Sequence, residues 1–234
     1  EAGKDVVTAN KALLAHHGAE LLASAGAKGR VVEYEASCAG GIPIIRALYD
    51  GLLANRVDAI YGIVNGTCNY ILSEITSRGR SYEQALAQAQ ADGLAEADPS
   101  LDVSGEDSAH KISIMATIAF GRTVPYQEIY VKGIDDLSLL DVQYGGELGY
   151  VVKLLAIASQ VGEGICLRVR PVFISRDHPI AWVSGPFNAV SVYGHTTGHT
   201  MYYGRGAGGG PTASAVIADL LTVGLGSYSL YFEG

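Results

Sequence analysis

Asp107 and Lys111 lie four residues apart in a segment whose apolar spacing predicts a helix over residues 104–120. On an ideal helix, both side chains fall inside the apolar arc that contains Met115 and Ile118. A lysine placed against a core face beside an acid is a candidate for proton transfer, because burial favours the neutral amine. The alternative is a solvated ion pair, which would stabilise the helix by only a few tenths of a kcal/mol.

Polar side chains gather on the opposite side of the same predicted helix, at His110, Ser113 and Thr117. A solvated ion pair would be expected on that polar side. Ser104 is a suitable residue to cap the N-terminus of the helix. The helical phase therefore favours a functional interpretation of the aspartate–lysine pair over a surface ion pair.

Three more carboxylates, Glu96, Asp98 and Asp102, precede this helix in a segment that Pro99 marks as a loop over residues 94–103. Such a cluster could bind a metal ion, compensate the positive end of the helix dipole, or bind a substrate. Carboxylates gathered without a cation repel one another, so a polar cationic ligand is a reasonable partner. The residues alone leave these possibilities open.

Three further segments contain groups that could bind a ligand. Asn10 precedes Lys11, a second lysine at the start of a predicted helix. Gly66 and Thr67 begin another predicted helix, whose free N–H groups could bind a carboxylate. The glycine-rich stretch 204–210 leads into a helix as well, but it lacks the GxGxxG spacing of a dinucleotide-binding loop. A surface connection is the alternative for that stretch.

The elements that must position these groups begin with a parallel α/β unit. A strand ends near Thr8, a helix runs from a cap at Asn10 to about residue 27, and a strand follows over residues 31–36. Helices are then expected over residues 43–54, 67–75 and 82–92, and a strand over residues 58–64. The helix over 82–92 has Ser81 and Gln84 in capping-box positions.

From residue 130 onward the pattern changes to long strands. These are expected over residues 150–159, 165–175, 188–193 and 200–204, followed by a helix over 212–223. They predict an antiparallel or mixed sheet with helices on one face. The fold class is therefore α/β (α+β): a remnant of a Rossmann-like dinucleotide-binding domain over residues 1–36, with 205–225 packing back on it, and a mixed-sheet domain over residues 37–204. Residues 227–234 resemble the remnant of a protease-cleavage tag.

The composition narrows the class of protein. The 234 residues have a formal net charge of −8 at pH 7, with 48% hydrophobic and 17% charged residues. These values are typical of a globular protein and argue against a nucleic-acid partner. No apolar run reaches the roughly 18 residues needed to cross a membrane. Three distant cysteines predict a reducing cytoplasm and lack the spacing of zinc ligands.

Five segments resemble the homoserine dehydrogenase family in their order and spacing. They are VVTANK (6–11), EASCAGGIPII (35–45), GIVNGTCNYIL (62–72), GLAEADPSLDVSGEDSAHK (93–111) and YGRGAGGGPTASAVIAD (203–219). The fourth segment is highly specific, whereas the glycine-rich one alone would not be. The resemblance implies a cytoplasmic enzyme that interconverts L-homoserine and L-aspartate 4-semialdehyde with NAD or NADP, in the biosynthesis of threonine, methionine and isoleucine.

The resemblance also implies roles for particular residues. Lys111 would exchange the proton of the substrate hydroxyl or carbonyl group, and Lys11 would assist from the cofactor side. Glu96 and Asp107 would bind the substrate ammonium group, with Asp102 in support. The remaining implied sites are substrate contacts at Gly66, Thr67 and Gly93, cofactor contacts at Lys11, Gly93, Gly206 and Gly208, and a sodium site made by the Glu35 side chain and the backbone carbonyls of Cys38, Gly40 and Ile42.

The sequence departs from the family pattern in three places. The N-terminal strand with its glycine-rich dinucleotide-binding loop is absent, Leu94 stands where some members have tyrosine, and no regulatory extension follows. We therefore expect that this chain alone does not bind the cofactor normally. The expected assembly is a homodimer or homotetramer built through the domain over residues 37–204. The alternatives are a related NAD(P)-dependent oxidoreductase of another small amino or hydroxy acid, or a non-catalytic oligomerisation module.

Overall fold

The computed structural model describes residues 2–225, which form one large sheet, one small sheet and the helices around them. The large sheet has six strands in the order β4-β6-β5-β3-β7-β8. Its pairs are antiparallel except for β4 with β6, so the predicted mixed sheet is confirmed. The strands are β3 (Val57–Ile63), β4 (Tyr130–Val131), β5 (Tyr150–Val161), β6 (Gly164–Ser175), β7 (Phe187–Gly194) and β8 (Gly198–Arg205).

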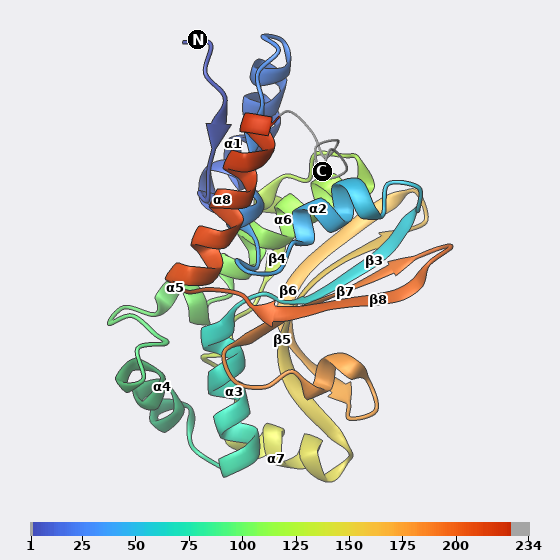
Figure 1. Ribbon diagram of the computed structural model, residues 1–234. Helices are drawn as coiled ribbons and strands as arrows, with labels where there is room; N and C mark the ends of the chain where they lie inside the picture. Colours follow the sequence, from blue (N-terminus) through green and yellow to red (C-terminus); the bar gives the residue numbers. More distant parts are fainter. Residues whose placement is uncertain (1, 226–234) are drawn as a thin grey trace, which may run out of the picture.

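Both faces of the large sheet are covered, at least in part. Side chains alternate along a strand, so Leu154 and Ala156 of β5 pack in one core while Leu155 packs in the other. Helices α3 (Gly66–Arg78) and α6 (Glu106–Phe120) lie against the first face, as Figure 1 shows. The short 3-10 helix η4 (Pro179–Trp182) covers part of the second face.

The smaller helices lie around α3 and α6. They are α2 (Ile44–Arg46), the π-helical turn η2 (Ala47–Gly51), α4 (Tyr82–Ala91), α5 (Ser100–Val103), the 3-10 turn η3 (Tyr126–Glu128) and α7 (Leu139–Glu147). The predicted capping box of α4 is present: the Ser81 hydroxyl accepts from the Gln84 backbone, and the Gln84 side chain accepts from the Ser81 backbone. Helix α3 ends at Gly79, whose φ of 62° is readily adopted by glycine.

The N-terminal segments form a separate parallel unit. Strands β1 (Val6–Val7) and β2 (Val32–Glu33) pair in parallel, and α1 (Lys11–Gly26) connects them. Asn10 caps α1 by accepting a hydrogen bond from the backbone of Leu13, as predicted. Helix α8 (Gly209–Leu225) lies beside both strands (Figure 1). The domain boundary at residue 36 stays a prediction, and the segment interpreted as a tag remnant lies outside the described residues.

Several boundaries were predicted wrongly. The strand expected over residues 31–36 contains only two residues, because Glu35–Ser37 form a 3-10 turn (η1). The helix expected over residues 43–54 is divided between α2 and a π-helical turn. The loop expected over residues 94–103 contains the short helix α5. Helix α6 is preceded by Gly105 rather than by a serine cap, because the chain turns there with a φ of 90°.

The polar side of α6 is not solvated, contrary to the simplest interpretation of its pattern. His110 is 8% exposed and Ser113 is 2% exposed. Helix α1 packs against this side, and the His110 ring stacks on Tyr126 with ring centroids 4.6 Å apart. The Ser113 hydroxyl donates to the carbonyl oxygen of Val124 at 3.2 Å. Helix α6 is therefore enclosed on both sides, although the buried Nδ1 atom of His110 has no hydrogen-bond partner among the described residues.

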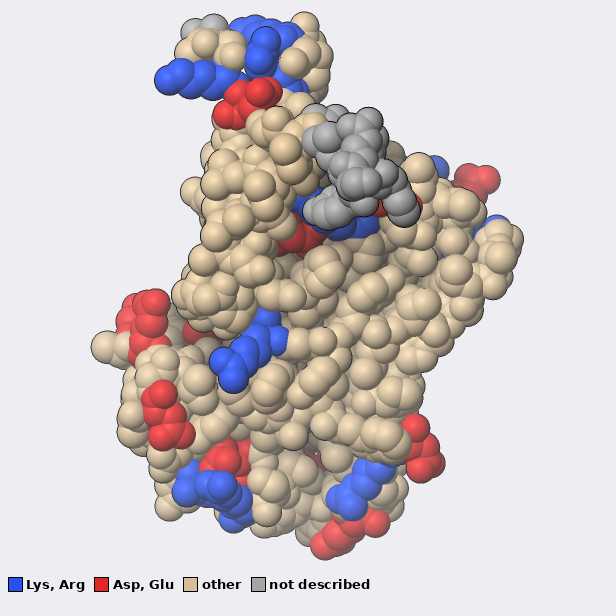
Figure 2. Space-filling view, viewed as in Figure 1, with Lys and Arg blue, Asp and Glu red and all other residues tan. Residues whose placement is uncertain are grey.

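The charge on the surface and the length and apolar character of the helices are relevant to the partners this protein could contact. On the face shown in Figure 2, charged side chains lie in separate groups, and much of the surface over the large sheet carries no charge. Within residues 2–225, no helix combines the length and apolar character needed to cross a membrane.

Candidate active site

Gly105 places the start of α6. A Cβ atom at this position would lie 3.1 Å from a methyl group of Val131 and equally close to one of Val169, and the φ of 90° disfavours any other residue. Asp107 follows in the first turn, where the positive end of the helix dipole favours a carboxylate. Lys111 lies one turn later, so both side chains point the same way.

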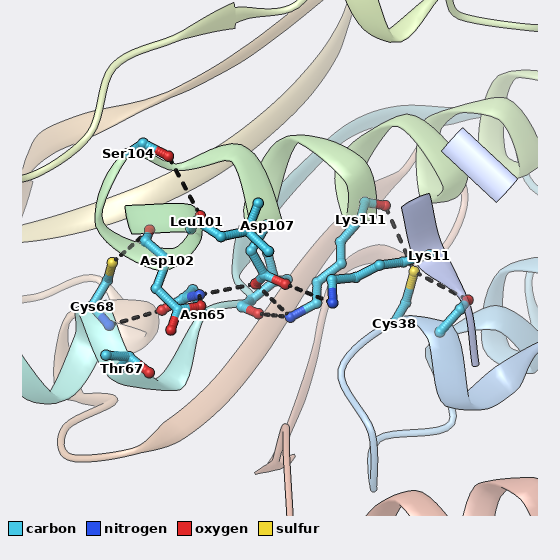
Figure 3. A network of polar contacts seen from close by, with 12 residues as sticks. Lys11, Cys38, Asn65, Thr67, Cys68, Leu101, Asp102, Ser104, Asp107 and Lys111 are labelled. Atoms are coloured by element: carbon cyan, nitrogen blue, oxygen red, sulfur yellow. Dashed lines mark hydrogen bonds and ion pairs between the residues drawn. The ribbon is translucent and has the colours of Figure 1, made fainter. Parts of the chain in front are cut away.

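Asp107 is the centre of the polar network in Figure 3. Its two carboxylate oxygens face the Lys111 ammonium at 2.8 Å and the Lys11 ammonium at 3.2 Å. The carboxylate is 5% exposed. Burial opposes its ionisation, but the two ammonium groups and a hydrogen bond from Asn65 outweigh this and lower the pKa of Asp107 to about 2. Asp107 is therefore a fixed anion between two lysines that are 100 residues apart in sequence.

The Lys111 ammonium is held from two directions. It donates to Asp107 at 2.8 Å and to the carbonyl oxygen of Val64, at the end of β3, at 2.6 Å. Its side chain is 12% exposed, compared with 31% for Lys11. Because an ammonium group has three N–H donors, the third donor of Lys111 is available for a ligand.

Asn65 holds two of the acids in place, and the sequence analysis did not select it as a site residue. Its side-chain oxygen accepts from the Cys68 backbone at 2.8 Å, which caps α3. Its side-chain nitrogen donates to Asp102 at 2.7 Å and to Asp107 at 2.9 Å (Figure 3). The helix-capping role is visible in the sequence, but the second role depends on how α3 and α6 pack together. No sequence pattern indicates it.

A cavity of about 750 Å³ opens beside this network. Its wall includes both lysines and the three acids Glu96, Asp102 and Asp107. Glu96 is exposed, whereas Asp98 does not line the cavity. The predicted residues that line it are Lys11, Gly40, Gly66, Thr67, Gly93, Glu96, Asp102, Asp107, Lys111, Gly206 and Gly208. The wall also includes Asn65, Asn188 and Arg205, which the sequence analysis did not select.

The start of α3 forms one side of the cavity. The Thr67 hydroxyl donates to the Leu94 carbonyl at 2.7 Å, which ties the loop after Gly93 to the helix. This hydroxyl is therefore already used. The backbone N–H groups of Gly66 and Thr67 lack intrahelical acceptors, as at any helix start, and they can bind an anion.

The glycines at the predicted cofactor positions of the cavity fall into two kinds. A Cβ atom on Gly206 would collide with the Asn188 amide, so glycine is required there by packing within the protein. Gly93 and Gly208 have φ values of 71° and 110°. A Cβ atom would meet nothing within 4 Å at Gly93 and only the Pro211 ring at Gly208. The backbone at these two positions is open, which fits the close approach of a flat ring such as a nicotinamide.

The predicted sodium residues lie in one buried turn behind the cavity. The Glu35 carboxylate accepts from the backbone N–H groups of Ile45 and Arg46, each at 2.9 Å. Burial raises the pKa of Glu35 to about 7, although these two hydrogen bonds oppose the shift. Each oxygen accepts one of these hydrogen bonds and keeps a further lone pair, so they fix the Glu35 side chain and leave acceptor capacity for a cation. Within residues 2–225, no cluster of three or more His, Cys, Asp or Glu side chains could bind a metal.

The backbone of that turn would supply the carbonyl ligands of the predicted sodium site. Cys38 and Ile42 are almost fully buried, and Gly40 lies close to the Gly206 carbonyl. The Cys38 thiol also lies 3.7 Å from the Lys111 carbonyl oxygen, so the turn packs directly on α6. Burial raises the pKa of Cys38 to about 12, so this thiol is not a thiolate ligand.

The sequence of this chain is similar to those of known proteins. Residues 43–221 match the family model described as homoserine dehydrogenase. A homoserine dehydrogenase of Pseudomonas aeruginosa is 52% identical over 223 residues, which are 95% of this chain and 51% of that protein. A homoserine dehydrogenase of Neisseria gonorrhoeae is 48% identical over 223 residues, which are again 95% of this chain and 51% of that protein. This chain therefore spans about half the length of the curated relatives it matches.

Solved structures show the same similarity. The crystal structure of a homoserine dehydrogenase from Thiobacillus denitrificans superposes with a TM-score of 0.93 at 52% identity, covering 94% of this chain and 51% of that one. A hyperthermophilic archaeal homoserine dehydrogenase mutant, solved in complex with NADPH, superposes with a TM-score of 0.83 at 29% identity. It covers 97% of this chain and 66% of that one.

Proposed function

Since the chain belongs to the homoserine dehydrogenase family, we propose that the protein containing it interconverts L-homoserine and L-aspartate 4-semialdehyde with NAD or NADP. This reaction belongs to the biosynthesis of threonine, methionine and isoleucine. The observation that carries the proposal is the buried Asp107 carboxylate between Lys11 and Lys111 at the wall of a cavity.

The substrate would be bound at both of its charged ends. Glu96 and Asp102 lie at the cavity wall and offer carboxylates to the substrate ammonium group. Asp107 adds to the negative potential there but already pairs with two lysines. The substrate carboxylate would face the N–H groups of Gly66 and Thr67 at the start of α3. These two contacts would fix the reacting carbon between them.

Lys111 would act on the reacting oxygen. Its free N–H can donate a proton to the aldehyde oxygen during reduction, and the resulting amine can take the proton back during oxidation. The ion pair with Asp107 at 2.8 Å would fix the position of the Lys111 ammonium group beside the reacting oxygen. Lys11 lies 3.2 Å from the same carboxylate and keeps a second positive charge near the oxygen as negative charge develops.

The dinucleotide would supply or accept the hydride. The residues that would hold its nicotinamide ring are Gly93 and Gly208, whose backbone is open, and Lys11, which lines the same cavity. The neighbour solved with NADPH supports a nicotinamide cofactor for the family.

The remaining expectations are narrower proposals. We infer that a monovalent cation such as sodium binds to the Glu35 side chain and the backbone carbonyls of Cys38, Gly40 and Ile42, which lie together in one buried turn. We also propose a homodimer or homotetramer formed through the large sheet. Phe173 and Tyr203 on the sheet and Trp182 in η4 expose large apolar side chains that a partner subunit would cover. A reducing cytoplasm fits the free thiols of the described residues.

Activity tests this function directly. The complete protein should form NADH or NADPH from L-homoserine, and homoserine should be preferred by orders of magnitude over other small amino and hydroxy acids. Preference for another compound would indicate the related oxidoreductase instead. The oligomerisation-module alternative predicts no thermal stabilisation by homoserine, whereas an enzyme predicts stabilisation that grows with ligand concentration.

A further inference from the structure

Lys153 is a buried lysine outside the cavity. It lies in β5 and is only 4% exposed. Its ammonium group donates to the side-chain oxygen of Asn69 at 3.0 Å and, through a short contact, to the carbonyl oxygen of Val183. Among the ion pairs of residues 2–225, no carboxylate pairs with it. Burial alone lowers the pKa of Lys153 to about 8.

Asn69 connects this lysine to one loop. Its side-chain nitrogen donates to the carbonyl oxygens of Gly185 at 2.9 Å, Phe187 at 3.1 Å and Val183 at 3.3 Å. Ser73, one turn later on α3, accepts from the Gly185 backbone at 3.1 Å. Loop 183–187 is therefore fastened by polar groups from α3 and β5, although it belongs to neither.

Loop 183–187 reaches the proposed active site. Pro186 and Phe187 line the cavity. A Cβ atom on Gly66 would lie 2.8 Å from the Pro186 carbonyl oxygen, so the loop packs directly on the start of α3. This is the helix start proposed to bind the substrate carboxylate. A shift of the loop would move or uncover that helix start.

An unpaired buried ammonium group is costly for stability. Methionine would fill a similar volume in the sheet without that cost. A lysine at this position therefore contributes something that an apolar residue could not. Within residues 2–225, its ammonium group donates to the loop and to the asparagine that binds the loop.

We propose that Lys153 is a positioning residue for the substrate, holding loop 183–187 against the start of α3 through Asn69 and Val183. The proposal rests on the function proposed above. It predicts that loss of the Lys153 ammonium weakens substrate binding more than it slows the chemical step, because Lys11, Asp107 and Lys111 lie on other elements.

The test compares steady-state kinetics of the complete protein with Lys153→Met, with Lys132→Met as the control at an exposed lysine. For Lys153→Met, KM for L-homoserine should rise about tenfold, which corresponds to about 1.4 kcal/mol, while kcat should change by less than about threefold. KM for the dinucleotide and all constants of the control should be unchanged. Unchanged KM for homoserine, or an equal loss of kcat and kcat/KM, would overturn the proposal.

A second variant keeps the test decisive if Lys153→Met fails to fold. Asn69→Asp keeps an oxygen for Lys153 but removes the N–H donors that bind three loop carbonyls, so it should raise the same KM. Combined with Lys153→Met, its effect should be less than additive. Trp182, the only tryptophan of these 234 residues, precedes the loop and reports its position by fluorescence without any substrate. An unchanged Trp182 spectrum in both folded variants would refute the inference, whereas an inactive wild-type protein would refute only the proposed function.

Discussion

The Asp107 carboxylate lies 2.8 Å from the Lys111 ammonium, one helical turn along α6, and both side chains face a cavity rather than solvent. A surface pair at this spacing contributes little to stability. Here the acid is 5% exposed and also pairs with Lys11. The pair thus holds a protonated amine at a fixed place beside open space, which is the arrangement that proton donation requires.

Replacing Lys111 with methionine should remove this proton donor while filling a similar volume. We expect kcat for reduction of L-aspartate 4-semialdehyde to fall by about 10²–10⁴-fold, measured from NADPH or NADH oxidation. The melting temperature should change little, because Lys11 still pairs with Asp107. Lys132→Met is the control. Full turnover in a folded Lys111→Met protein would contradict the proposed role.

The free energy of unfolding should depend on pH in a way that reveals the titration of Lys153. Burial lowers its pKa from 10.5 to about 8 in the folded protein. Between these values the unfolded chain binds a proton that the folded chain does not, so this group makes stability rise with pH from about 8 to 10.5. Below pH 8 the buried ammonium group is charged in the folded protein, and its burial lowers the stability.

Urea unfolding of wild type and Lys153→Met across pH 7–10.5 would measure this difference. Groups common to both proteins cancel in the comparison. Wild type should gain stability relative to the variant as pH rises, by a few kcal/mol at most. Parallel curves would show that Lys153 titrates normally.

Much of the candidate site could be predicted from the sequence because it depends on local patterns. The spacing of Asp107 and Lys111 on an amphipathic helix placed them on the side that faces other elements. Asn10 and Ser81 marked helix starts through capping chemistry that acts within four residues. The long strands β5 and β6 followed from apolar, β-branched runs separated by glycine-containing turns.

Contacts between distant segments could not be predicted in this way. Lys11 meets Asp107 only because α1 packs against α6. The same packing buries His110, whose polar type suggested an exposed side of the helix. Lys153 occurs inside a strand pattern that does not reveal its carbonyl partner Val183, 30 residues away. These features depend on tertiary arrangement, which periodicity does not encode.

Gly133 offers a test of how tightly the start of α6 is packed. An added Cβ would lie 2.1 Å from the Val103 carbonyl and 2.7 Å from the Ser104 backbone, neither of which can rotate away. Gly133→Ala should therefore displace the turn before α6 and destabilise the protein by about 1–3 kcal/mol or more, measured by urea unfolding. Gly26→Ala, in an open position of α1, should be neutral or stabilising by up to about 1 kcal/mol. Equal stability of the two variants would show that the turn is loosely packed.

Asn65→Asp tests whether the amide that joins the two acids matters for chemistry. Aspartate caps a helix as well as asparagine does, so α3 should remain stable. The variant loses both N–H donors and places a third carboxylate beside Asp102 and Asp107, which in the wild type accept from Asn65 at 2.7 and 2.9 Å. Like charges favour protonation, so one carboxylate of the group should titrate at higher pH than in the wild type.

The expected result is a loss of kcat/KM at neutral pH together with an upward shift of the acidic limb of its pH profile. Asn10→Asp, at the cap of α1, controls for the stability effect of exchanging the capping residue and should leave the melting temperature nearly unchanged. If Asn65→Asp lowered activity equally at every pH, the amide would act only by shaping the cavity. A shifted acidic limb with an intact fold would instead identify the charge of the Asp102–Asp107 pair as the quantity that Asn65 controls.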